Sequence, residues 1–270
     1  MSEIIVFPEY ESTKNAVEKL RTELSMLMLE YDELRFVECK NIEMAYMLEL
    51  GRYEYKAFEA QCAFLRLRRK VEMLQAKKNR QETIVLAAIE EALDKEFEEF
   101  QEKLNEQLGK MNDAISRSKS DILSEEDTKE LKKLYRRIIK ALHPDLHPNE
   151  TEERIVMFEK AVDAYESGDL ATLRIIDAMV SEPTIVETHD DALTELTKEK
   201  NRLSSLVEHV KTKIAELKEQ YPYNVKWVVN DKEKTKERLQ ELIDITRQYE
   251  AGIEIYQARI NEMLEGCAHG

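Results

Sequence analysis

The feature that most restricts the fold of this chain is a long stretch almost free of helix-breaking residues. No proline lies between Pro8 and Pro144, and only Gly51 and Gly109 interrupt this region. Apolar residues recur within it at alternating intervals of three and four, which is the spacing of one face of a coiled-coil helix. The first such series comprises Val17, Leu20, Leu24, Leu27, Tyr31 and Leu34. The spacing predicts one helix from about residue 12 to residue 50.

Gly51 is the expected reversal point after this helix, because glycine readily takes the left-handed conformation that ends a helix. Two further apolar series follow it: Ala57, Ala60, Phe64, Leu67, Val71 and Leu74, and then Leu86, Ile89, Leu93, Phe97, Phe100, Leu104, Leu108, Met111 and Ile115. A helix with a single apolar stripe needs a partner to cover it. The neighbouring helix in an antiparallel hairpin is the simplest partner, and a homodimeric coiled coil is the alternative that the sequence leaves open.

The C-terminal third repeats this pattern on both sides of a break. Its first series is Leu193, Leu196, Leu203, Val207, Val210, Ile214 and Leu217, and its second is Leu239, Leu242, Thr246, Tyr249, Ile253, Tyr256, Ile260 and Met263. Pro222 and Asn224 interrupt the helix between them. We therefore expect a second antiparallel hairpin, with Asp231 capping its second helix. The single tryptophan, Trp227, is expected to fold back onto this hairpin, with a contact point at the turn as the alternative.

The composition agrees with an all-α protein of long helices. Charged residues make up 36% of the chain, hydrophobic residues 42% and aromatic residues 7%, and glycine and proline are scarce, as in long-helix proteins. The net charge of −15 argues against nucleic acid or an anionic membrane as the main partner. The basic patch formed by RLRRK, residues 66–70, and KKNR, residues 77–80, is therefore interpreted as a solvated helix face, with nucleic-acid binding as the alternative.

No apolar run reaches the roughly 20 residues that a membrane-spanning helix needs. The N-terminal sequence MSEIIVFPEY also lacks the basic start and long apolar run of a signal peptide. The sequence therefore predicts a cytoplasmic protein without a membrane partner.

The region from about residue 120 to residue 182 differs from the rest of the chain, because it contains two His-Pro pairs. The helix expected before them carries apolar residues on one face: Leu131, Leu134, Tyr135, Ile138 and Leu142. Its opposite face is basic: Lys129, Lys132, Lys133, Arg136, Arg137 and Lys140. Ser124 followed by Asp127 is typical of a helix N-terminus. The helix must end near His143, because Pro144 disfavours helical geometry in the residue before it.

A second helix is expected after the loop, with Thr151 as its cap and with Phe158, Ala161 and Tyr165 facing the first helix. Two antiparallel helices would then hold His143, Pro144 and Asp145 at their tip, beside the basic face. The second pair, His147-Pro148, is expected to end this loop and lead into the next helix. The two histidines are not expected to bind a metal, because Pro144 breaks the helix that would align them and no third ligand lies near.

These segments, LKKLYRRIIKALHPD and FEKAVDAY, resemble the J-domain, the module of co-chaperones that act on DnaK-type heat-shock ATPases. The resemblance covers about a quarter of the chain. It implies that His143, Pro144 and Asp145 form the loop that triggers ATP hydrolysis by the partner. It further implies a docking face on the helix before the loop, formed by Lys132, Lys133, Arg136, Arg137 and Lys140.

The chain departs from the J-domain pattern in two respects. The family's short first helix is not evident; the helix around residues 104–115, or the segment SDIL at residues 120–123, is the expected substitute. Neither a Gly/Phe-rich segment nor zinc-binding cysteine repeats follow the motif, so the usual client-binding parts of a full DnaJ are absent.

The sequence thus predicts three domains: an N-terminal coiled-coil arm (1–118), a J-domain-like domain (119–183) and a C-terminal hairpin (184–270). The expected function is that of a co-chaperone whose arms hold an unknown protein client. A structural adaptor with the J-like domain as a mere scaffold is the alternative. No enzymatic activity and no cofactor are expected, since no nucleophile–base pair, glycine-rich loop or metal cluster is evident.

Overall fold

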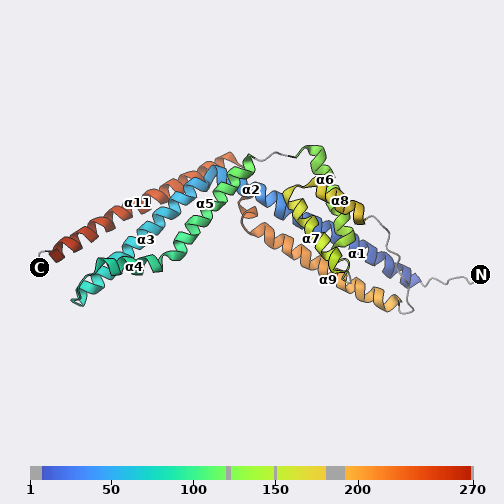
Figure 1. Cartoon of the computed structure of the whole chain (residues 1–270), viewed down its shortest axis with the longest axis horizontal. Coiled ribbons are helices and arrows are strands. Elements are labelled where there is room, and N and C mark those ends of the chain that lie inside the picture. The colour runs from blue at the N-terminus through green and yellow to red at the C-terminus, as the bar shows by residue number, and fades with distance from the viewer. Residues whose placement is uncertain (1–7, 120–122, 149–150, 181–191, 269–270) are drawn as a thin grey trace, which may run out of the picture. The chain divides into compact units, whose positions relative to one another are not determined.

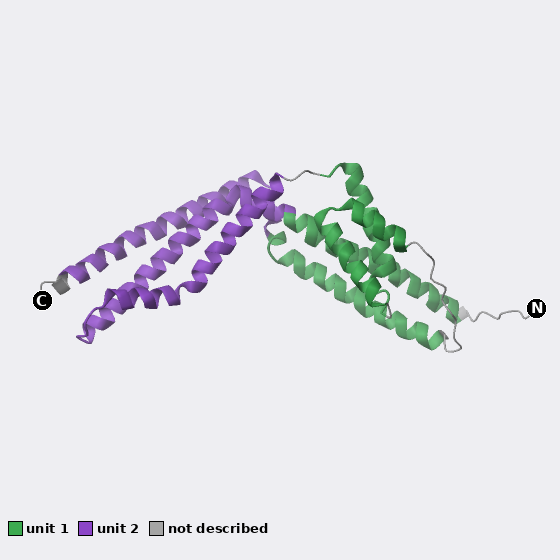
Figure 2. Ribbon diagram, viewed as in Figure 1, with its two compact units in different colours: residues 1–40, 121–224 green, residues 41–120, 225–270 purple. Residues whose placement is uncertain are grey.

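The computed structural model describes residues 8–119, 123–148, 151–180 and 192–268 (Figure 1). Throughout these ranges the regular secondary structure is helical and includes no strand, which confirms the predicted all-α class. The chain forms two compact units, each assembled from two separate segments (Figure 2). Unit 1 contains residues 1–40 and 121–224, and unit 2 contains residues 41–120 and 225–270. Each unit therefore depends on pairing between distant parts of the sequence.

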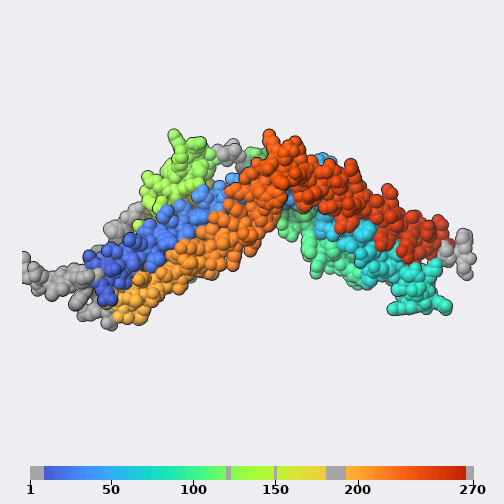
Figure 3. All heavy atoms as spheres, turned by 180° about the vertical axis from the view of Figure 1, so that it is seen from behind, coloured from blue at the N-terminus to red at the C-terminus, as the bar shows by residue number. Residues whose placement is uncertain are grey.

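Unit 1 is built around two long helices that lie side by side (Figure 3). Its elements are α1 (Pro8–Asp32), the π-helical turn η1 (Glu33–Glu38), α6 (Glu125–Leu142), α7 (Glu152–Ser167), α8 (Leu170–Val180) and α9 (Ala192–Glu219). Helix α9 packs along α1, and α6 packs against α1, α7 and α8. Ion pairs join Arg21 to Glu199, Glu23 to Lys211 and Glu30 to Lys218. Because the residue numbers rise together along both helices, α1 and α9 run parallel.

One continuous hydrophobic core holds unit 1 together. Helix α6 contributes Leu131, Leu134, Tyr135, Ile138, Ile139 and Leu142, and α7 and α8 contribute Phe158, Ala161, Ala164, Tyr165, Leu173 and Ile176. The same core includes Val17, Leu24 and Met28 of α1, Leu34 and Phe36 of η1, and Leu203, Val207, Val210 and Ile214 of α9. The region from α6 to α8 therefore shares its core with α1 and α9 rather than forming a core of its own.

Unit 2 is arranged around a central helix, α3. Its elements are α2 (Cys39–Tyr46, which begins in unit 1), the π-helical turn η2 (Met47–Gly51), α3 (Arg52–Asn79), α4 (Leu86–Glu96), α5 (Glu98–Ser118), α10 (Lys226–Val229) and α11 (Lys232–Ala268); the short helix η3 (Tyr223–Val225) lies at the boundary. Helix α11 packs along α3, and α4 and α5 also pack against α3. The ring of Phe64 contacts Tyr249 and Tyr256 of α11, with centroid separations of 5.5 and 5.3 Å.

The predicted reversal at Gly51 is wrong. Gly51 has helical angles, φ −54° and ψ −41°, and helical segments follow one another from Pro8 to Asn79. Glycine permits a left-handed turn but does not require one. A β-carbon at Gly51 would lie 3.2 Å from Cγ of Met111, so this glycine allows close approach of α5. The chain turns instead after Asn79, where Gln81 has φ +54°, and α3 then pairs with α4 and α5 as the predicted neighbouring hairpin.

The predicted C-terminal hairpin is also wrong. Its two helices belong to different units, where α9 packs along α1 and α11 packs along α3. The break between them is at the expected place, and the Asp231 carboxylate accepts a hydrogen bond from the backbone N–H of Glu233 at 2.9 Å. Trp227 does not fold back, since it is 60% exposed while its neighbour Val228 is buried.

The three predicted domains do not coincide with the two compact units. The predicted N-terminal arm is divided between the units at residues 40 and 41, and the predicted C-terminal domain is divided at residues 224 and 225. The predicted boundary between residues 183 and 184 lies outside the described residues. The physical reason is that an apolar stripe fixes which face of a helix is buried, but neither its partner nor its direction.

Candidate partner-binding site

The helix before the His-Pro pairs begins as its sequence indicates. Oγ of Ser124 accepts a hydrogen bond from the backbone N–H of Asp127 at 3.0 Å and donates one to its carboxylate at 2.7 Å. This cap satisfies a backbone donor that the helix leaves free. The apolar face of α6 is buried as predicted, and Ile139 joins it. The opposite, basic face is therefore turned away from the core.

The chain leaves α6 at His143, which has extended angles, φ −60° and ψ 127°, as expected before Pro144. The carbonyl of His143 accepts backbone hydrogen bonds from Leu146 at 2.9 Å and from His147 at 3.0 Å. Leu146 is 2% exposed and belongs to the unit 1 core. The His143-Pro144-Asp145 loop is therefore a compact turn, closed by its own backbone and anchored by one buried leucine.

The side chain of His143 is part of this turn. Its ring packs edge-on against Phe158 of α7, with centroids 4.8 Å apart, and its Nδ1 accepts a hydrogen bond from the backbone N–H of Asp145 at 3.1 Å. Burial lowers the pKa of His143 to about 4, while Asp145 opposes the shift and His147 and Lys213 add to it. The imidazole is therefore neutral near pH 7 and carries its proton on Nε2.

His147 closes the turn from the other side. Its Nε2 lies 2.9 Å from the carbonyl oxygen of Lys140, and Nη2 of Arg154 donates to the carbonyl of Ala141 at 3.0 Å. Both carbonyls belong to the last turn of α6, whose acceptors have no partner within the helix. The second His-Pro pair thus ends the loop, as the sequence predicted. Thr151 occupies the N-cap position of α7, but its side chain makes no capping hydrogen bond.

The five residues of the predicted docking face fall into two groups. Lys132 forms an ion pair with Glu33 of η1, and Arg137 forms two hydrogen bonds with Asp177 of α8, at 2.8 and 2.5 Å. The other three are exposed and have no ion-pair partner within the described ranges: Lys133, Arg136 and Lys140. We call these three the free basic row. The row leads along α6 to the loop, and the two paired cations lie at its edges.

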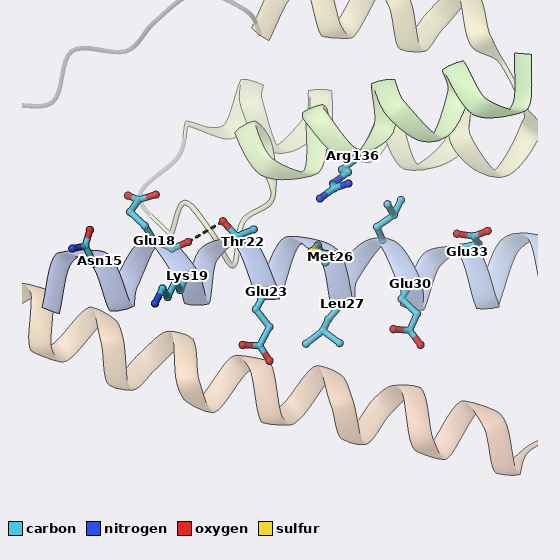
Figure 4. Close-up of a pocket in the computed structure, with 11 residues that line it drawn as sticks. Asn15, Glu18, Lys19, Thr22, Glu23, Met26, Leu27, Glu30, Glu33 and Arg136 are labelled. Carbon is cyan, nitrogen blue, oxygen red and sulfur yellow. Dashed lines mark hydrogen bonds between the residues drawn. The ribbon is translucent and has the colours of Figure 1, made fainter. Parts of the chain in front are cut away.

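A groove on α1 borders the free basic row (Figure 4). Arg136 extends from α6 toward α1, where Met26, Leu27 and Leu29 provide the apolar lining and Glu33 lies at one end. Met26 is 51% exposed. The basic row and this partly apolar strip of α1 form one accessible surface of unit 1.

Sequence reasoning missed two residues that contact this region. Nη1 of Arg202, on α9, donates a hydrogen bond to the backbone carbonyl of Asp145 at 2.7 Å. Asp32, on α1, accepts a hydrogen bond from the Tyr135 hydroxyl at 2.8 Å. Burial raises the pKa of Asp32 to about 6, although Tyr135 and Arg35 act in the opposite direction. No local signal marks either residue, because each lies far from the loop in the sequence.

The helix that packs against α6 in place of the expected short first helix is α1. Helix α5, which contains residues 104–115, belongs to unit 2, and the alternative SDIL segment lies largely outside the described residues. The rings of Tyr135 and Tyr165 stack 4.1 Å apart beneath the Asp32 hydrogen bond. The N-terminal helix therefore completes the α6–α8 region.

The second basic stretch, residues 66–70, is mostly paired within unit 2. Arg66 contacts Glu90 and Asp94 of α4, each at 2.7 Å, and Lys70 also pairs with Glu90. Arg69 contacts Glu96 at 2.9 Å. These cations serve as links between α3 and α4, which weakens the interpretation of the stretch as a free anion-binding patch.

Comparison of the chain with protein-family models, curated proteins and solved structures found no match. Within the described ranges, no cluster of three or more histidine, cysteine or acidic side chains has the arrangement of a metal site. In the same part of the chain, no helix combines the length and apolarity needed to cross a bilayer.

Proposed function

We propose that this chain is a J-domain-type co-chaperone that docks on a DnaK-type heat-shock ATPase and stimulates its ATP hydrolysis. The observation that carries the proposal is the free basic row of α6 (Lys133, Arg136 and Lys140) leading directly to the compact His143-Pro144-Asp145 turn. A cytoplasmic location and an unidentified protein client belong to the same proposal. The exposed faces of the long helices offer surface for such a client.

The chemistry required of this chain is selective binding rather than catalysis. A partner ATPase is accelerated only if the chain binds its hydrolysis-competent state more tightly than its resting state. The free basic row would speed encounter with an acidic surface in a salt-dependent manner. The closed turn would present the Asp145 carboxylate to a partner cation with little ordering entropy to lose. Neutral His143 would hold the turn together through Phe158 and the Asp145 amide.

The test is the steady-state ATPase rate of a bacterial DnaK-type chaperone with and without the full chain. We expect stimulation by the wild type and its loss in Asp145→Asn, since this change removes the charge and keeps the shape. His143→Gln should also lose stimulation. Circular dichroism of each variant must show wild-type helicity, because His143 contacts the core residue Phe158.

The free basic row is tested by charge reversal. Lys133→Glu with Arg136→Glu should raise the concentration needed for half-maximal stimulation by about tenfold or more, because two favourable charges become repulsive. Lys95→Glu is a charge-reversal control, since Lys95 is an exposed cation of α4 whose ion pair among the described residues is with Glu91 of its own helix. Equal effects of the two changes would contradict a role of the row in docking.

One observation favours the alternative of a structural adaptor. The α6–α8 region shares its hydrophobic core with α1 and α9, so it also stabilises the packing of these two long helices. In that case the wild type would not stimulate the ATPase at any concentration although it is folded. Analytical ultracentrifugation would then show whether the chain assembles through its helices, as a homodimer or with other proteins.

A further inference from the structure

Helix α9 contacts the His143-Pro144-Asp145 loop at Asp145, the residue whose negative charge the proposed function requires. Arg202 donates to the Asp145 backbone carbonyl at 2.7 Å, and Leu203, the next residue of α9, is completely buried in the core that also holds Leu146. The contact joins residues 57 positions apart in sequence. It is therefore a tertiary contact made by packing of α9 and not a local feature of the turn.

Arg202 is held in place by a small network of charges. The carboxylate of Glu199 accepts hydrogen bonds from Nε and Nη2 of Arg202 at 2.7 and 2.9 Å, and Nη2 of Arg21, on α1, donates to Glu199 at 3.3 Å. A guanidinium bound at two points has little rotational freedom left. The parallel α1–α9 pair thus fixes a cation beside Asp145.

The turn is closed by its own contacts, and the hydrogen bond from Arg202 to the Asp145 carbonyl further restrains its motion. Its own contacts already define it: the two backbone hydrogen bonds to the His143 carbonyl, the bond from the Asp145 amide to His143, and burial of Leu146. Besides this hydrogen bond to the Asp145 carbonyl, Arg202 places a positive charge beside Asp145. A partner cation that approaches Asp145 must share this position with Arg202 or displace it, at a cost in binding free energy.

From this geometry we propose that α9 is an intramolecular restraint on the His-Pro-Asp loop. Arg202 holds the loop in a resting position and lowers its affinity for the partner ATPase. This inference rests on the proposed function, because it describes regulation of the same site. An event that draws Arg202 or α9 away from Asp145 would then increase stimulation of the partner.

The test compares the full-length variant Arg202→Met with the wild type and with Arg174→Met. Arg174 is a matched control: it forms two hydrogen bonds with Glu130, at 2.8 and 2.7 Å, but Glu130 lies about 20 Å along α6 from His143 at 1.5 Å per residue. Arg202→Met should lower the concentration for half-maximal ATPase stimulation by about threefold or more. Hydrogen exchange at the backbone amides of Leu146 and His147 should become faster. Arg174→Met should change neither quantity.

ATPase stimulation and amide exchange together distinguish failure of the proposed restraint from failure of the proposed function. If the wild type stimulates the ATPase and Arg202→Met is equal or weaker, the restraint is refuted while the proposed function stands; a weaker variant would mean that Arg202 positions the loop for binding. Unchanged amide exchange in Arg202→Met also refutes the restraint. If no protein stimulates the ATPase, the wild type included, the proposed function is refuted and the restraint with it.

Discussion

At the scale of single residues, two half-buried titratable groups of unit 1 respond to pH in opposite directions. Burial lowers the pKa of His143 to about 4, so the folded state binds this proton less readily than the unfolded state. Burial raises the pKa of Asp32 to about 6, so the folded state binds that proton more readily. A difference in proton affinity between the two states makes the free energy of unfolding depend on pH.

The pH dependence of stability should therefore change in opposite ways when each group is removed. The stabilising contribution of His143 to the free energy of unfolding is present above pH 6.5 and is lost as the pH falls toward 4. The stabilising contribution of Asp32 is present below pH 3.8 and is lost as the pH rises through 6. The free energy of unfolding, plotted against pH between pH 4 and 7, should therefore have a different slope in His143→Gln and in Asp32→Asn than in the wild type. His143→Gln should remove an acid-induced loss, and Asp32→Asn should remove an acid-induced gain, each on the order of 2–3 kcal/mol.

Urea unfolding at several pH values measures both slopes. The same slope in all three proteins would contradict the burial of these groups. The orientation of Tyr135 is not expected to change in Asp32→Asn, because the amide oxygen of asparagine can still accept its hydrogen bond.

At the scale of elements, close approach of helices decides where glycine is needed. A β-carbon at Gly252 of α11 would lie 2.5 Å from the ring of Phe64 on α3, whereas a β-carbon at Gly109 of α5 would meet nothing within 4 Å. Both glycines lie inside helices, where alanine is intrinsically favoured by about 1 kcal/mol. Packing should override this preference at Gly252 only.

The substitutions Gly252→Leu and Gly109→Ala test this difference. Gly252→Leu should lower the free energy of unfolding by about 1–3 kcal/mol, since Phe64 must leave its contacts with Tyr249 and Tyr256. Gly109→Ala should raise it by up to about 1 kcal/mol. Chemical denaturation gives both values; destabilisation by Gly109→Ala or tolerance of Gly252→Leu would contradict the observed α3–α11 packing.

At the scale of the whole molecule, each compact unit pairs an early helix with a late one. In unit 1 the pairing of α1 with α9 is parallel and brings Glu23 to within 3.0 Å of Lys211 and Glu30 to within 3.2 Å of Lys218. Parallel pairing of helices requires a connection that returns along their length. In this chain the intervening sequence includes the α6–α8 region, which packs on α1.

Zero-length carbodiimide cross-linking of the native chain with mass spectrometry should therefore join Glu23 to Lys211 and Glu30 to Lys218. The same treatment in urea is the control and should give neither product. Cross-links between α9 and α11, with none between α9 and α1, would instead indicate the hairpin expected from the sequence.

Much of the candidate site was predictable because its signals are local. Pro144 ends α6, Ser124 begins it, and the three-and-four spacing places the apolar and basic faces on opposite sides. The pairing of Lys132 and Arg137 was not predictable, because their acceptors, Glu33 and Asp177, come from other elements. For the same reason Arg202 was not predictable, since its role depends on α9 lying against the loop.

The sequence by itself determined the helical class, the buried face of each helix and the compact turn at His143, because these follow from residue spacing and from the local stereochemistry of proline and capping side chains. Only the tertiary structure decided which helices pair, in which direction, and which cations remain free. Hydrophobic stripes are interchangeable to a first approximation, so the choice among partners depends on the sum of many contacts along the whole chain. That choice places Arg202 beside Asp145 and Asp32 beside Tyr135.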